Sequence, residues 1–73
     1  MKTILSDNGK PLNVGDRVTV VLYAGLGRTV LDATILELPD APTHKKAIRV
    51  KYDGGGEDYV RQLDVYKDAT HLR

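Results

Sequence analysis

The chain has 73 residues, enough for one small domain with a compact core, since a chain of this size buries only about 60% of its unfolded surface. It has no cysteine and only two histidines, which excludes disulfides and thiolate metal sites, and we expect neither a metal nor a cofactor. Eleven basic and ten acidic residues give a net charge of +1, which is far from the strongly basic balance of a protein that depends on phosphate attraction.

The N-terminal residues 1–13 are predicted to form an arm that precedes the folded domain. Their only apolar pair is Ile4 and Leu5, which is too short for a signal peptide, and no stretch approaches the roughly 20 apolar residues of a membrane span. We therefore expect a soluble, cytoplasmic protein. Ile4 and Leu5 are predicted to form a short strand that ends in a tight turn at Asn8-Gly9.

Alternating hydrophobicity from residue 17 onward predicts strands rather than helices. The first strand is expected over 17–23, with a dry face and a wet face. The dry face comprises Val18, Val20 and Leu22, and the wet face comprises Arg17, Thr19 and Val21. After a loop at 24–27, a second strand over 29–38 is long enough to bend. Residues 39–46 contain two prolines and are predicted to be an exposed loop.

The second half of the chain predicts three more strands. One covers 47–52, with Ile48, Val50 and Tyr52 inward, and the next covers 58–62. One helical turn and a short closing strand over 62–66 are expected to place Leu63 and Val65 in the core. Residues 68–73 are expected to be a frayed tail. This pattern predicts an all-β domain over 14–67, a small five-stranded SH3-like barrel in which closure removes unpaired strand edges.

Three consecutive glycines, at 54–56, interrupt this pattern between two strands. A phosphate-binding loop would place a helix N-terminus directly after its glycines, whereas here a strand follows, and Glu57 and Asp58 would repel phosphate. Asp53-Gly54 is a strong hairpin signal, and the additional glycines allow a bulge or a corner of the barrel. We therefore interpret the glycines as a turn.

Residues 14–38, "VGDRVTVVLYAGLGRTVLDATILEL", resemble the KOW motif of transcription and ribosomal proteins. The likeness is carried by Gly15, Asp16, Val18, Gly25 and Gly27. Residues 50–65, "VKYDGGGEDYVRQLDV", are similar to the Tudor pattern, in which a strand, a short helical turn and a final strand follow the glycines. The matching residues there are Val50, Tyr52, Asp53, Gly55, Val60 and Leu63. Both families are SH3-like barrels.

The KOW resemblance implies a non-enzymatic module that binds RNA polymerase, ribosome or RNA through exposed loops. A free-standing module of this size resembles the small proteins with which bacteriophages inhibit or antiterminate host transcription. The implied function is a small transcription regulator, acting as a monomer, that docks on bacterial RNA polymerase. This last step is an analogy at the level of the fold.

Two surfaces are candidates for partner binding. The loop "YAGLGR" offers Tyr23, Leu26 and Arg28, a mixture typical of interface hot spots, although Leu26 would alternatively fold back to plug the barrel end. The second surface is a basic stripe of Lys45, Lys46, Arg49 and Lys51. The stripe would face an acidic protein or a nucleic-acid backbone, which makes RNA or DNA binding the alternative function, or it would be a solvated edge that discourages aggregation.

Two further hypotheses concern small ligands and catalysis. A Tudor-like reader of methylated side chains would bring Tyr23, Tyr52 and Tyr59 into an aromatic cage, but the chain has no tryptophan or phenylalanine to complete one. Catalysis is not expected, because Ser6, His44 and His71 lie in unrelated segments. Glu57 and Asp58 point to opposite faces of a strand, where we expect both to be solvated. An enzyme with a site shared between subunits of an oligomer is the remaining alternative.

Overall fold

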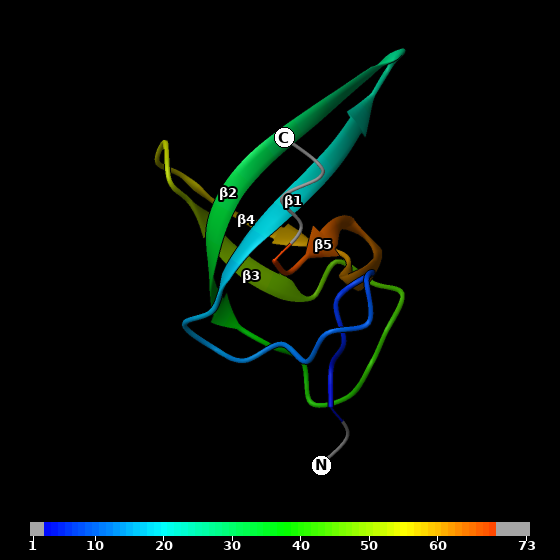
Figure 1. Ribbon diagram of the computed structural model, residues 1–73, viewed down its shortest axis with the longest axis vertical. Coiled ribbons are helices and arrows are strands. Elements are labelled where there is room, and N and C mark those ends of the chain that lie inside the picture. Colours follow the sequence, from blue (N-terminus) through cyan, green and yellow to red (C-terminus); the bar gives the residue numbers. More distant parts are fainter. Residues whose placement is uncertain (1–2, 69–73) are drawn as a thin grey trace.

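The computed structural model describes residues 3–68, which form one antiparallel sheet of five strands (Figure 1). The elements in chain order are β1 Arg17–Ala24, β2 Gly27–Glu37, β3 Ile48–Tyr52, β4 Glu57–Val60, the 3₁₀ turn η1 Gln62–Asp64 and β5 Val65–Tyr66. Their order in the sheet is β4-β3-β2-β1-β5. The prediction of an all-β domain is confirmed, and within residues 3–68 no helix is long and apolar enough to cross a membrane.

The sheet is not closed into a barrel, contrary to the sequence-based expectation. β4 and β5 are its two edges, and no ladder of hydrogen bonds joins them within the described residues. The edges are protected in other ways. The N–H of Asp7 donates to the carbonyl of Val65 (2.8 Å), so the N-terminal segment covers β5, while the Asp58 carboxylate accepts the N–H of Tyr59 in β4 (2.8 Å). An exposed edge invites pairing with another chain, and both contacts reduce that hazard.

β2 bends, as its predicted length suggested, and serves two different neighbours. Its residues 27–34 pair with β1, whereas the pairing with β3 runs from Ala33 to Glu37 and contains a register shift after Ile35. A bulge of this kind bends a strand and increases its twist. The outer parts of β1 and β2 consequently leave the sheet as a two-stranded ribbon that projects from the body (Figure 1).

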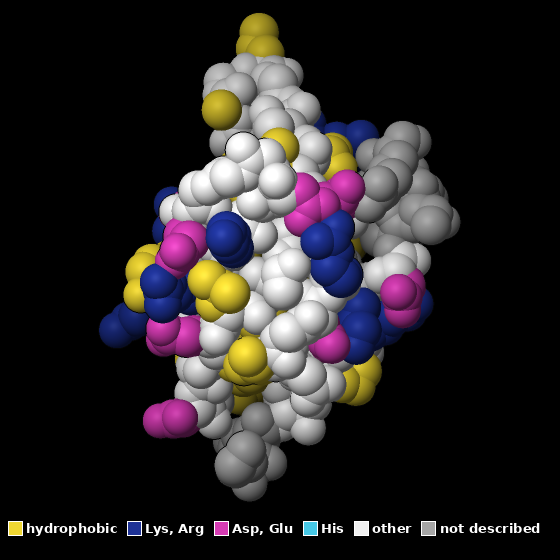
Figure 2. All heavy atoms as spheres, turned by 90° about the vertical axis from the view of Figure 1, so that its left-hand side faces the viewer, with side chains coloured by type: hydrophobic (Ala, Val, Ile, Leu, Met, Phe, Trp, Pro, Cys, Tyr) yellow, Lys and Arg dark blue, Asp and Glu magenta, His cyan; other side chains and the backbone are white. Residues whose placement is uncertain are grey.

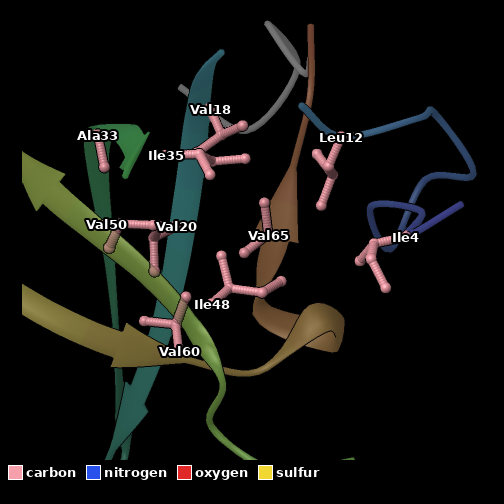
Figure 3. Close-up of a cluster of buried hydrophobic side chains, with 10 residues drawn as sticks. All are labelled: Ile4, Leu12, Val18, Val20, Ala33, Ile35, Ile48, Val50, Val60 and Val65. Atoms are coloured by element: carbon pink, nitrogen blue, oxygen red, sulfur yellow. The ribbon is translucent and has the colours of Figure 1, made fainter. Parts of the chain in front are cut away.

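The core lies on one face of the curved sheet, where side chains from all five strands meet (Figure 3). Its buried members are Ile4, Leu12, Val18, Val20, Ala33, Ile35, Ile48, Val50, Val60 and Val65. The structure confirms as core most of the residues that were predicted to face inward, and it leaves two of them partly buried against it. The buried ones are Val18, Val20, Ile48, Val50 and Val65, and the partly buried ones are Leu22 and Tyr52. The N-terminal segment also contributes, because Ile4 and Leu12 pack against the strands.

The opposite face of β1 differs from its prediction, because Thr19 and Val21 are buried rather than wet. Thr19 pairs directly with Tyr66 of β5, so the side chains of both residues lie on the same face of the sheet. Simple alternation of apolar and polar residues predicts one dry face, and it does not reveal a strand that is covered on both sides.

The predicted turns are present at both glycine signals. Gly9 adopts φ +80° in a turn closed by a hydrogen bond from its N–H to the carbonyl of Ser6 (2.9 Å), and a bridge joins Leu5 to Pro11. In the triple-glycine segment, Gly55 (φ +101°) and Gly56 (φ +90°) reverse the chain between β3 and β4. The expected tail at 68–73 falls almost wholly outside the described residues, as does His71.

Candidate functional site

The β1–β2 hairpin carries the most exposed apolar side chain of the described chain at its tip. Only Gly25 and Leu26 connect the strands, so the predicted loop at 24–27 is a two-residue turn. Gly25 has φ +58° and Leu26 does not have a positive φ, which is the pattern of a type II′ turn with glycine in the first position. Leu26 is 111% exposed and does not fold back on the sheet.

Tyr23 and Arg28 stand beside each other below this tip. They are partners in the β1–β2 register, so both side chains lie on the same face of the ribbon. Tyr23 is 69% exposed, and Arg28 is exposed and forms no ion pair with any residue of 3–68. Figure 2 shows hydrophobic side chains at the end of the projecting hairpin. The structure thus brings Tyr23, Leu26 and Arg28 together on one projecting element.

The predicted basic stripe is not continuous. Arg49 is partly buried on β3, where its guanidinium donates to Glu37 (Nη1 to Oε1, 2.7 Å) and to Glu57. The hydrogen bond to Glu37, with that to Glu57, raises the pKa of Arg49 above its ordinary value. Lys45, Lys46 and Lys51 are exposed, and none of them forms an ion pair with residues 3–68. Arg49 is therefore committed to carboxylates of its own chain.

The side of the molecule seen in Figure 2 carries charges of both signs. Arg17 contacts Asp53 through both of its terminal nitrogens, with Nη1 at 2.7 Å from Oδ1. Figure 2 shows basic and acidic side chains interspersed below the hairpin rather than gathered by sign. Such a face attracts a phosphate backbone weakly, because phosphate binding depends on the number of phosphates that free cations neutralise.

The three tyrosines proposed for a methyl-ligand cage do not converge. Tyr52 faces the core, where its hydroxyl donates to Asp58 (3.1 Å), whereas Tyr59 lies opposite Arg49 on the other face of the sheet. Tyr23 lies on the projecting hairpin. Burial, with the hydrogen bond to Asp58, raises the pKa of Tyr52 to about 12.

The residues considered for catalysis also remain apart. The hydroxyl of Ser6 is buried, contacts Asn8 and accepts the N–H of Lys10 (3.0 Å), while His44 lies exposed in the β2–β3 loop. Within residues 3–68 no group of three or more histidine, aspartate or glutamate side chains is placed to hold a metal.

Glu57 and Asp58 point to opposite faces of β4 and are exposed to solvent, as predicted, but both also have partners within the sheet. Glu57 contacts Arg49, and Asp58 accepts hydrogen bonds from Tyr52 and from the Tyr59 N–H. The partners lie on neighbouring positions of the folded sheet, so the local sequence gives no sign of them.

The 3₁₀ turn η1 contains a feature that sequence reasoning missed. Leu63 was expected in the core but is 56% exposed, whereas Asp64 is 8% exposed. Arg61 accounts for the exchange, because its Nε and Nη2 donate to the two carboxylate oxygens of Asp64 (3.2 and 3.3 Å) and satisfy the partly buried charge. Arg61 and Asp64 are three residues apart, which places them on the same side of a 3₁₀ turn, and this spacing in the sequence could have predicted their contact.

Comparison with protein-family models, curated proteins and solved structures finds no match for this chain.

Proposed function

We propose that this chain is an SH3-like, non-enzymatic docking module that binds a larger protein through the tip of its β1–β2 hairpin. The observation that carries the proposal is the full exposure of Leu26 on a two-residue turn, with Tyr23 and Arg28 beside it. A large apolar side chain held outward by a tight turn loses little conformational freedom on binding, which favours affinity. Tyrosine and arginine are also the side chains that most often dominate interface energetics.

The SH3-like assignment is supported by the order of elements along the chain. The segment with the Tudor-like pattern runs from β3 through the glycine turn to β4, then through one 3₁₀ turn to a final short strand. The KOW-like residues also have structural reasons to be present, since Gly15 (φ +93°) and Gly25 (φ +58°) adopt backbone angles that favour glycine and Val18 lies in the core.

For the partner, we propose bacterial RNA polymerase, with regulation of transcription as the outcome, on the basis of the KOW-like segment. The test is binding of the purified protein to immobilised bacterial RNA polymerase. We expect Leu26→Ser to weaken binding at least roughly tenfold, as removal of a hot-spot side chain does. Val14→Ser is the matched control, because Val14 is also an exposed apolar side chain, at 63%, but lies outside the hairpin.

Two results would count against the proposal. Equal binding by the Leu26→Ser and Val14→Ser proteins would remove the hairpin as the docking element. Absence of polymerase binding by the unaltered protein, together with capture of a different protein that Leu26→Ser abolishes, would keep the hairpin and replace the partner.

Nucleic-acid binding remains the second candidate, because Lys45, Lys46 and Lys51 have no acidic partner in the described part of the chain. Binding to phosphates should weaken linearly with the logarithm of salt concentration, whereas a contact built on Leu26 should respond little to salt. A salt titration of any complex formed therefore separates the two functions.

A further inference from the structure

A pocket lies between the β2–β3 loop and η1, on elements separate from the hairpin. Its walls are Pro42, Thr43, His44, Gln62 and Leu63, and its volume is about 220 Å³. Pairing of Ile48 with Val60 brings the end of the loop beside the start of η1, which creates the pocket. Pro42 and Leu63 give it apolar surface, and Leu63 is exposed there because Asp64 occupies the inward position of the turn.

Two cations follow directly after the wall of this pocket. The backbone N–H of Lys45 donates to the hydroxyl of Thr43 (3.2 Å), which fixes the chain next to the pocket as it turns toward Lys46. Both lysines are exposed and form no ion pair within the described residues. The adjacent acidic side chain, Asp64, is already bound by Arg61. Along the described chain, two unpaired cations therefore follow the wall and one exposed carboxylate, Asp40, precedes it, while the walls themselves are partly apolar.

We propose that this pocket binds an acidic peptide segment of a partner protein. An aliphatic side chain of the segment enters between Pro42 and Leu63, and its neighbouring carboxylates face Lys45 and Lys46. The volume is several times the share of one liquid water, about 30 Å³, so an aliphatic group fits. Complementary charge at the rim steers the encounter and fixes the orientation, while the apolar contact adds affinity.

The same observations favour a peptide over a nucleic acid. The nearby Arg49 is held by Glu37 and Glu57, so the free cations at this site are two neighbouring lysines that would neutralise few phosphates. Among the wall residues only His44 carries an aromatic ring, and the apolar surface that Pro42 and Leu63 supply is aliphatic, which suits an aliphatic side chain better than a stacked base.

The test uses a peptide with one leucine between two runs of three glutamates, titrated into the isotopically labelled full chain at low salt. We expect NMR shift changes at the amides of Thr43, His44, Gln62 and Leu63, and not at Leu26. Replacing the peptide's leucine by glycine, or its glutamates by lysines, should abolish these changes.

Variants of the protein test the two parts of the site separately. Leu63→Ser should raise Kd roughly tenfold by removing an apolar contact, and the exposure of Leu63 means that the fold tolerates the change. Lys45→Gln with Lys46→Gln should raise Kd roughly fivefold, the effect of two exposed charge contacts. Lys51→Gln, an exposed cation on β3 outside the pocket, is the matched control and should leave Kd unchanged.

Three results would overturn the proposal. These are no shift changes around the pocket, equal binding of the leucine and glycine peptides, and tighter binding of an RNA oligonucleotide that Lys45→Gln with Lys46→Gln abolishes. None of them would bear on the hairpin, because the hairpin test uses polymerase and a variant at Leu26.

Discussion

The ammonium group of Lys67, near the end of the described chain, contacts the segment that leads into β1. Its Nζ donates to the carbonyl of Pro11 (3.0 Å) and to the carboxylate of Asp16 (2.9 Å), and Asp16 also accepts the N–H of Asn13 (2.9 Å). Asn8 adds to the junction, since its side-chain amide donates to the carbonyl of Lys67 (2.7 Å) and accepts the N–H of the same residue (3.2 Å). These contacts hold the N-terminal segment against the end of β5.

The Asp16 carboxylate makes this junction sensitive to acid. The hydrogen bond from Lys67, followed by that from Asn13, lowers the pKa of Asp16 below its ordinary value of 3.8. A carboxyl with a lowered pKa in the folded state stabilises the protein above its unfolded pKa, and that contribution is lost as pH falls through the folded pKa. We predict that Asp16→Asn reduces the loss of unfolding free energy below pH 3.8, as measured by urea unfolding at several pH values.

Asp40→Asn is the control for this prediction. It also removes one exposed carboxylate, but Asp40 forms no hydrogen bond or ion pair within residues 3–68. If both variants follow the acid profile of the unaltered protein, the Asp16–Lys67 contact does not contribute to its acid sensitivity.

At the residue level, hydrophobicity alone placed some side chains correctly and missed those whose positions depend on polar partners. Val65 was correctly expected in the core. Leu63 was also expected there but is exposed, because hydrophobicity favours burial of leucine over aspartate and takes no account of the contact by which Arg61 stabilises the buried Asp64. Arg49 was interpreted as a free cation because Glu37 and Glu57 reach it only through the register of β2, β3 and β4.

Among the elements, the glycine turn between β3 and β4 contains one position that requires glycine, Gly55, and one that does not, Gly54. Gly55 has φ +101°, a backbone angle that is strained for side chains other than glycine, whereas Gly54 does not have a positive φ, and an added Cβ at either residue meets no atom within 4 Å. Space is therefore equal at the two positions, and only the backbone angle differs.

We predict that Gly55→Ala lowers the free energy of unfolding by about 1–2 kcal/mol, the cost of a left-handed residue with a Cβ. Gly54→Ala should change it by less than about 1 kcal/mol, in the stabilising direction, because alanine restricts the unfolded chain. Urea unfolding followed by tyrosine fluorescence suits a chain without tryptophan. Equal destabilisation by both substitutions would show that the backbone angle at Gly55 is not what requires glycine.

In the molecule as a whole, buried apolar side chains stabilise the fold, whereas exposed apolar side chains are available to partners. Ile35 is fully buried in the central strand β2, at the point where the pairing shifts from β1 to β3, whereas Leu26 is fully exposed on the same hairpin. We therefore expect Ile35 to contribute much more than Leu26 to the free energy of unfolding, although both are large apolar side chains.

We predict that Ile35→Ala lowers the free energy of unfolding by about 2–5 kcal/mol, a large part of the stability of a small domain. Leu26→Ala should change it by no more than about 0.5 kcal/mol, as expected for a surface position. Thermal unfolding by circular dichroism measures both. A loss at Leu26 as large as that at Ile35 would mean that the hairpin tip serves folding rather than docking.

The sequence by itself determined the all-β class, the positions of the strands to within a few residues and the turns at Gly9 and Gly55. Alternation and glycine content act over a few neighbouring residues, so the local sequence carries this information. The tertiary structure decided that the sheet stays open, that Thr19 and Val21 are covered, that Arg49 is paired and that the β2–β3 loop meets η1 to form a pocket. Each of these depends on which distant segments meet, and such meetings are set by the summed packing of the whole chain rather than by any one stretch of it.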